Sequence, residues 1–295
     1  MTGAFFSLCA AFFWAASVIL FKISGETISP VPLNIFKSLI AFILICLTMF
    51  ILNIDFFPDQ PLNNWLWLSA SGIIGIALSD LFFFMALNRL GAGLTAIVDC
   101  LYLPSVIFFS FLFLSEDLSN TAVIGGILVF IAVLVGSLSL KKNKTQTKQK
   151  LIIPWFGLII GCLSMIFVAI SIVIIKELLP QTNVFWATLV RVVASMISLL
   201  AIVICHPKRK QYIKELKFSK AWRYAVPASI CGNYLAILFW MGGMKYTTAS
   251  KAAILNQMST IFIFIMAAVF LNEKITPNRV VAICLALTGA CLTIL

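Results

Sequence analysis

Four ionisable side chains fall inside long apolar stretches of this sequence: Lys37, Asp80, Asp99 and Arg191. A charge in such a setting costs about 2.5 kcal/mol or more unless it faces a water-filled cavity or a partner, so each is a candidate functional residue. Two of the four are cationic and two are anionic. The cations can bind an anionic or carboxylate-bearing substrate, or they can form structural pairs with the aspartates or extend to the membrane interface.

Lys37 and Arg191 are the candidate substrate-binding cations. Lys37 shares its helical face with Asn34, and Arg191 shares its face with Thr188, because residues three apart are neighbours on a helix. A pair of cations with polar neighbours suits a substrate that carries a carboxylate group.

Asp80 and Asp99 are the candidate coupling residues. A low-dielectric cavity favours the protonated form of a carboxyl group, so proton binding and substrate binding could compete there. The alternative is a permanent ion pair of Asp80 or Asp99 with Lys37 or Arg191, which would keep the carboxylate charged.

Other polar and aromatic residues of the apolar stretches could complete a substrate site. We expect substrate contacts from Asp99, Tyr102, Asn233, Asn256, Gln257, Trp14 and Trp240. Glu116 and Glu273 close two apolar stretches, and for them we expect a capping or gate role.

Catalytic and cofactor signatures are not evident in the sequence. The single histidine, His206, lies in a basic segment, and there is no zinc-binding spacing, nucleophile elbow or phosphate loop. We therefore predict no metal and no cofactor. The basic segments lack interleaved aromatic residues, which argues against a nucleic-acid partner.

The composition requires that lipid surround most of the chain. Hydrophobic residues make up 62% of 295 positions, charged residues 11%, and the mean hydropathy is +1.10. A helix needs about 20 apolar residues to cross a bilayer, which gives ten spans and an all-α integral membrane fold. We place the spans at 3–24, 32–53, 65–88, 92–115, 121–140, 152–175, 183–205, 222–244, 249–271 and 277–295.

The chain is organised as two similar halves. The basic segment 141–150 separates a first five-helix repeat, 1–140, from a second, 151–295. Residues 75–138 align with 232–295 without a gap at an offset of 157, and at an offset of 154 Lys37 falls on Arg191. Since five is odd, the second repeat must enter the membrane inverted, an arrangement typical of transporters.

Loop charges predict the orientation. Sixteen Lys and Arg residues fall in odd-numbered loops and only three in even-numbered loops. The positive-inside rule therefore places the odd-numbered loops in the cytoplasm and both termini outside.

Three strings make the sequence similar to a known family. They are FWAASVILFK, which ends at Lys22, LFLSEDLS at 112–119 and VFLNEKIT at 269–276. Together with the two five-helix repeats they resemble the EamA-like family of the drug/metabolite transporter superfamily. Members usually have Gly before the glutamate, where this chain has Ser115 and Asn272. The resemblance implies a ten-helix carrier with a central cavity for amino acids, nucleotide-related compounds or other small metabolites.

These observations predict a multi-pass protein of the cell membrane, with a bacterial inner membrane as the expected location. We expect a secondary transporter of a small polar or zwitterionic metabolite, such as an amino acid, that works by alternating access with or without proton coupling. A passive channel and, less favoured, an intramembrane lipid-modifying enzyme are the alternatives. The expected partners are the substrate and the bilayer, and the protein would be a monomer or a homodimer.

Overall fold

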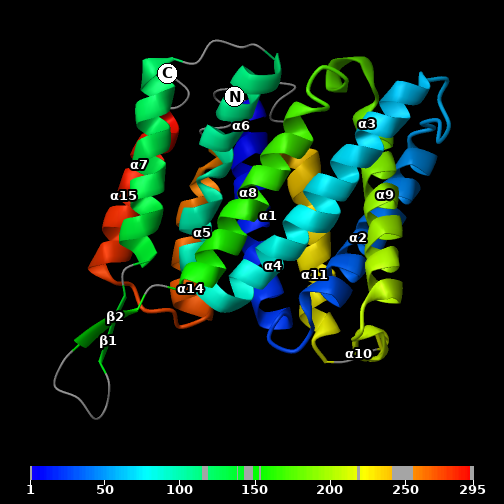
Figure 1. Ribbon diagram of the computed structural model, residues 1–295. Helices are drawn as coiled ribbons and strands as arrows, with labels where there is room; N and C mark the ends of the chain where they lie inside the picture. Colours follow the sequence, from blue (N-terminus) through cyan, green and yellow to red (C-terminus); the bar gives the residue numbers. More distant parts are fainter. Residues whose placement is uncertain are drawn as a thin grey trace.

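The computed structural model describes residues 2–114, 119–137, 139–142, 149–152, 154–217, 220–240 and 255–292, and it is mainly helical (Figure 1). The elements before the basic segment are α1 (Thr2–Ser24), α2 (Pro30–Ile51), α3 (Leu62–Gly72), η1 (Ile73–Leu78), α4 (Ser79–Leu90), α5 (Ala92–Asp99), α6 (Tyr102–Leu114) and α7 (Asn120–Ser137). Those that follow are β1 (Ser139–Lys142), β2 (Gln149–Ile152), α8 (Trp155–Val173), η2 (Leu179–Gln181), α9 (Val184–Cys205), α10 (Arg209–Glu215), α11 (Trp222–Ser229), η3 (Ile230–Ala236), α14 (Met258–Phe270) and α15 (Pro277–Leu292).

Seven helices within the described residues are long and apolar enough to cross a membrane. They cover Thr2–Ser24, Pro30–Ile51, Leu62–Leu90, Ala92–Phe113, Asn120–Ser137, Trp155–Val173 and Val184–Cys205, and each overlaps one predicted span. Many large apolar side chains on them are exposed, as expected for surfaces that face lipid rather than water.

The last three predicted spans are represented by shorter or interrupted helices. Residues 222–240 are helical throughout, and α14 and α15 are apolar helices of 13 and 16 residues. Residues 241–254, which include parts of the predicted spans 222–244 and 249–271, lie outside the described residues.

Local sequence explains where the helices begin and break. α2 starts with Pro30, whose fixed φ suits a first helical position, and α9 starts after Asn183, whose side chain accepts a hydrogen bond from the Phe185 amide at 2.9 Å. The chain turns between α4 and α5 at Gly91, which has a φ of 79°. Ahead of Pro104, which lacks an amide proton, the helical path breaks between α5 and α6.

Two π-helical turns interrupt otherwise α-helical spans. η1 occupies residues 73–78 between α3 and α4, and η3 occupies residues 230–236 after α11. A π turn holds an extra residue in the turn and is often found at functional sites. Both turns contain a glycine, Gly75 or Gly232, that packs against a serine of another helix: Ser171 in the first case and Ser17 in the second.

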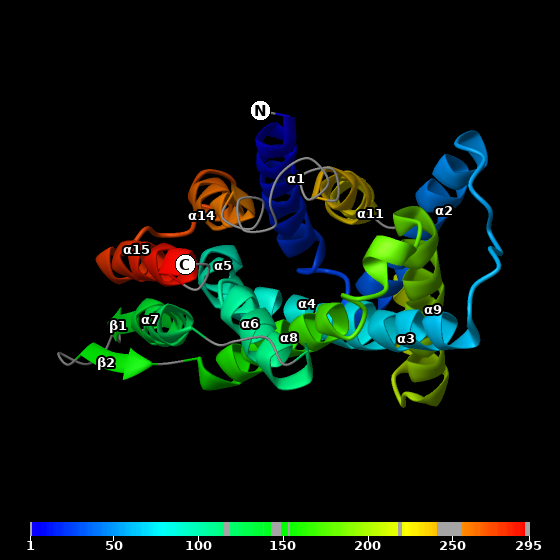
Figure 2. The same cartoon turned by 90° about the horizontal axis from the view of Figure 1, so that it is seen from above.

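The helices pack around a central space, with helices from opposite ends of the sequence side by side (Figure 2). α1 packs against α11, η3 and α14, while α8 packs against α4, η1 and α6. α2 packs against α9, and α7 pairs with α15 at the periphery.

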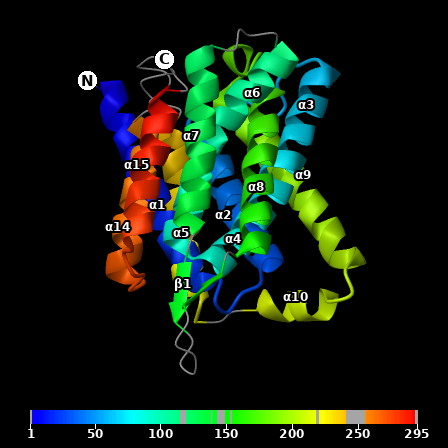
Figure 3. The ribbon, with the colours of Figure 1, turned by 60° about the vertical axis from the view of Figure 1, so that its left-hand side comes forward.

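The basic segments gather at one end of the molecule. The strands β1 and β2 form an antiparallel pair in which Ser139 lies opposite Ile152 and Lys142 opposite Gln149. This short hairpin lies at the same end as α10, whereas both termini lie at the other end (Figures 1 and 3). Residues 143–148 of the predicted linker lie outside the described residues.

Candidate functional site

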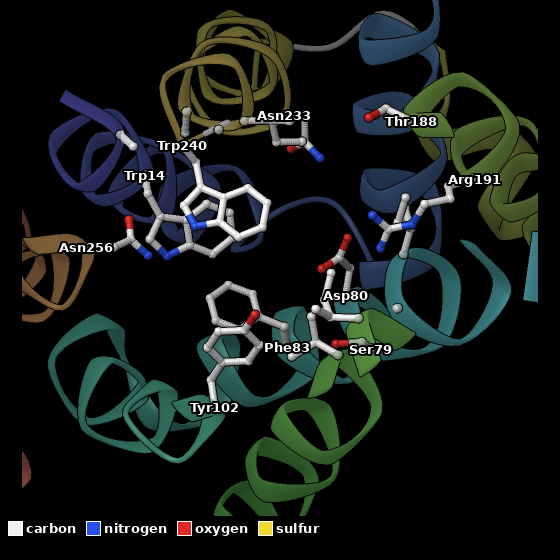
Figure 4. Close-up of a pocket in the computed structure, with 18 of the residues that line it drawn as sticks. Trp14, Ser79, Asp80, Phe83, Tyr102, Thr188, Arg191, Asn233, Trp240 and Asn256 are labelled. Carbon is white, nitrogen blue, oxygen red and sulfur yellow. The ribbon is translucent and has the colours of Figure 1, made fainter. Parts of the chain in front are cut away.

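A cavity of about 270 Å³ lies between the helices, and most of the predicted site residues line it. They come from α1, α4, α5, α6, α9, η3, the helix that follows η3, and the residues just before α14. Those in the lining are Trp14, Asp80, Asp99, Tyr102, Arg191, Asn233, Trp240, Asn256 and Gln257. The sequence therefore predicted residues that the fold brings together, although they are spread over most of the chain (Figure 4).

Lys37 lies behind the cavity wall and is the exception. Its ammonium group forms an ion pair with the Asp80 carboxylate, and the Lys37 side chain is only 3% exposed, whereas that of Asp80 is 22% exposed. The Asn34 side chain, one turn before Lys37, donates hydrogen bonds to the carbonyl oxygens of Ile76 and Ala77, each at 3.0 Å. Lys37 and Asp80 thus form the structural pair that the sequence left as an alternative, and Lys37 reaches the cavity only through Asp80.

Arg191 is the cation that faces the cavity. Its guanidinium group points toward Asp80 (Figure 4), and Arg191 and Tyr102 both line the cavity. Its buried Nε atom has no hydrogen-bond partner within the described part of the chain. Asp80 is already paired with Lys37, so the Arg191 side of the cavity keeps a positive charge.

Asp99 occupies a second, aromatic part of the cavity. Trp14 lies within hydrogen-bonding reach of the Asp99 carboxylate, and Phe83, Tyr102 and Trp240 line the same space. Asp99, Tyr102 and Arg191 all line this cavity, so both charges face one space. A carboxylate surrounded by aromatic rings suits an organic cation, because the ring faces also attract positive charge.

Amide side chains supply polar atoms between these two parts. Over the described residues, Asn233 Oδ1 and Gln257 Nε2 are buried without a hydrogen-bond partner. Buried polar atoms are nearly always paired, so these two are available to water or a ligand. Asn256, also in the lining, lies toward Trp14 (Figure 4).

Sequence analysis missed several lining residues, including Ser79 and Phe83. Ser79 donates a hydrogen bond to the Ser164 carbonyl oxygen at 2.9 Å and ties α4 to α8. Phe83 lies one turn after Asp80, so helical periodicity applied to Asp80 could have found it. Ser79 carried no comparable signal, because its partner comes from a distant part of the sequence.

Glu273 forms a cap between distant elements. Its carboxylate accepts hydrogen bonds from the Ala92 amide at 2.6 Å and the Gly93 amide at 3.2 Å, and it pairs with Arg279 at 3.2 Å. It thereby satisfies free amides at the start of α5, where a negative charge is also favoured. Glu116 lies outside the described residues.

The cavity extends toward the end of the molecule that holds the termini (Figure 1). Its lining includes Leu179 in the α8–α9 connection and Val184, the first residue of α9. The opposite end of α9 leads into α10, at the basic end of the molecule (Figure 3).

The chain is similar to known transporters over nearly its whole length. The profile of the EamA-like transporter family matches residues 1–138 and 155–295, on either side of the basic segment. An "Uncharacterized transporter" of Archaeoglobus fulgidus is 24% identical over 283 residues, which cover 94% of this chain and 92% of the relative. A solved structure titled "Crystal structure of protein" aligns with a TM-score of 0.68 at 15% identity and covers 98% of this chain and 95% of that one, a likeness of fold.

The family match and the apolar spans agree on a multi-pass membrane protein. The chain belongs to the EamA-like transporter family.

Proposed function

We propose that this protein is a secondary carrier for a small zwitterionic metabolite of the amino-acid type. The observation that carries the proposal is the cavity that presents Arg191 and Asp99 to the same space. Its volume of about 270 Å³ lies below the roughly 300–1,000 Å³ of sites for drug-sized ligands. A small metabolite fits this volume.

The charges of the cavity complement those of a zwitterion. Arg191 can bind a carboxylate through its planar guanidinium group, and Asp99, among Trp14 and Tyr102, can bind an ammonium group. A zwitterion that binds both side chains neutralises the charges of Arg191 and Asp99 at the same time. This neutralisation offsets the cost of burying either charge alone in a low-dielectric cavity.

Repeat symmetry supports a ten-helix carrier that works by alternating access. The π turns begin at residues 73 and 230, which differ by the predicted offset of 157. Gly75 packs against Ser171 and Gly232 against Ser17, so each repeat makes an equivalent contact with the other. The packing of α1 against η3 and α14 has its counterpart in the packing of α8 against η1 and α6. Two inverted halves of this kind can exchange outward-open and inward-open shapes around a shared site.

The charge distribution supports an outward-open state. The basic hairpin and α10 would lie in the cytoplasm by the positive-inside rule, and the cavity extends toward the opposite end. Contacts at the basic end hold it closed: Glu273 caps α5, and Glu215 of α10 accepts hydrogen bonds from the Ser29 amide at 2.8 Å and the Ser29 hydroxyl at 3.1 Å. The membrane we propose is the cell membrane, and the partners are the substrate and the surrounding lipid.

Asp99 is the coupling residue that the arrangement favours if transport uses protons. Asp80 is engaged by Lys37, whereas Asp99 lines the cavity among aromatic rings. A proton or the substrate ammonium group can then neutralise Asp99, and the two would compete.

Transport by purified protein in proteoliposomes tests the proposal. Vesicles loaded with each of the twenty common L-amino acids should take up the same labelled amino acid by counterflow, and uptake should saturate. Flux that rises linearly with concentration and shows no counterflow would instead indicate a passive channel. If none of the twenty is exchanged, an amino-acid substrate is ruled out.

A further inference from the structure

Asp80 is one of the charged, cavity-facing positions at which the two halves differ. At an offset of 154, Lys37 corresponds to Arg191, and at an offset of 157, Asp80 corresponds to Ile237. The first half therefore contains a cation and its carboxylate. The second half contains the cation, and an isoleucine stands where its carboxylate would be.

The cation of the first half is buried and paired with its carboxylate. The Lys37 side chain is 3% exposed and paired with Asp80, and its ammonium group also lies 5.7 Å from the centre of the Phe84 ring. Asp80 balances the charge of Lys37, and Lys37 is not among the residues that line the cavity.

The cation of the second half faces open space. Arg191 and Ile237 both line the central cavity. Ile237 and Thr188, the residue one turn before Arg191, also line a small adjoining cavity, so these two helix surfaces approach each other. Asn233, one turn before Ile237, has its buried Oδ1 unpaired within the described residues, as does Arg191 at Nε.

We propose that the substrate carboxylate takes the position beside Arg191 that corresponds to the Asp80 carboxylate in the other half, and that Ile237 keeps this position vacant. This inference rests on the proposed function and assigns the carboxylate to one cation. Arg191 binds the substrate, Lys37 holds Asp80 in place, and Ile237 determines specificity because an acid there would replace the substrate carboxylate. Asp80 limits the binding strength, because its carboxylate also lies on the side to which the Arg191 guanidinium points (Figure 4).

The experiment compares Ile237→Asp with Ile237→Asn, each with and without Arg191→Met. Asp and Asn have nearly the same size, so their difference reports the charge. Thermal unfolding of the detergent-purified protein without ligand is the first measurement, and counterflow of the twenty L-amino acids is the second.

We expect Ile237→Asp to unfold about 2–4 °C above Ile237→Asn when Arg191 is present, and the difference to vanish or reverse with Arg191→Met. We expect Ile237→Asp to reduce counterflow by at least about thirtyfold relative to Ile237→Asn.

Each other outcome has a definite meaning. If Ile237→Asp is no more stable than Ile237→Asn, or fails to fold when Ile237→Asn folds, the vacant carboxylate position does not exist and the inference is overturned. If the stability coupling to Arg191 is present but Ile237→Asp exchanges amino acids like Ile237→Asn, the position exists and the substrate does not use it, which also overturns the inference. If the coupling is present and no variant or wild type exchanges any amino acid, the proposed amino-acid substrate fails while the carboxylate position stands.

Discussion

The two π turns offer a direct comparison between the halves of this molecule. In the first half, Asn34 donates to the carbonyl oxygens of Ile76 and Ala77, both within the π turn η1. In the second half, the corresponding Thr188 instead donates to the Val184 carbonyl oxygen of its own helix, at 2.7 Å. The side chain at this position therefore joins two helices in the first half, whereas in the second half it bonds within its own helix. A duplicated sequence can give two halves with similar helices. A binding site can then arise in the half whose polar side chains no longer pair with each other.

The largest loss of stability should come from replacing Lys37. Lys37→Met leaves the Asp80 carboxylate without its buried partner, and breaking such a pair costs about 3–5 kcal/mol. We expect a strongly lowered unfolding temperature, measured by tryptophan fluorescence in detergent.

A matched double variant checks this assignment. Lys37→Met combined with Asp80→Leu removes both charges and should recover most of the lost stability, since a buried pair can often be replaced by apolar residues. If Lys37→Met alone unfolds like the wild type, the first half is not held together by this pair and the contrast with Arg191 fails.

The two glycines of the π turns test whether the halves remain alike where they pack. A Cβ atom at Gly75 would collide with Ser171, and one at Gly232 would collide with Ser17. Gly75→Ala and Gly232→Ala should each destabilise the protein by about 1–3 kcal/mol, as measured by thermal unfolding.

Replacing the facing serine provides the control for each glycine. Ser171→Gly should rescue Gly75→Ala, and Ser17→Gly should rescue Gly232→Ala. A large cost at one glycine and none at the other would show that the crossings are not equivalent.

Converting Asp99 to asparagine makes the halves more alike, because its repeat counterpart is Asn256. Asp99→Asn should fold normally and weaken the binding of an ammonium-bearing substrate about tenfold, or about 1.4 kcal/mol. If Asp99 also carries a coupling proton, the stimulation of uptake by an imposed pH gradient should disappear. If the affinity for the substrate and the stimulation of uptake by the pH gradient are both unchanged in Asp99→Asn, then Asp99 neither binds the ammonium group nor carries the coupling proton.

The smallest effect should come from the partner of the α5 cap. Arg279→Gln removes an ion pair whose side chains are 22% and 18% exposed, and partly exposed pairs contribute about 0.2–1 kcal/mol. Glu273→Ala should cost more, about 1 kcal/mol, because two amides of α5 lose their acceptor. Thermal unfolding of both variants shows which residue contributes more to stability. A larger loss of stability in Arg279→Gln than in Glu273→Ala would contradict the capping role of Glu273.

Much of the architecture could be predicted because it depends on local composition. Apolar length identified the seven spans that the described residues contain. The offset of 157 aligned Gly75 with Gly232, but it did not predict that each lies in a π turn. The partners could not be predicted. That Lys37 meets Asp80 depends on how two helices are rotated against each other, and the periodicity of one helix carries no information about its neighbour's rotation.

The candidate site shows the same limit. The sequence identified Arg191, Asp99 and Asn233 as unusual within apolar spans, because burying a polar group needs a reason. It treated Lys37 as equal to Arg191, since both match in type and repeat position. Only the distribution of counter-ions in three dimensions separates them.

Packing between the halves also bears on how the protein is made. α1 finds its neighbours in η3 and α14, which are synthesised only after the basic segment. The first half therefore enters the bilayer before most of its final neighbours exist, and helices inserted in this way can associate later. Lys37 and Asp80 both belong to this early half, so they can neutralise each other as soon as their spans meet. While the second half is being synthesised, Lys37 is therefore already paired and no unpaired lysine of this pair is exposed to lipid.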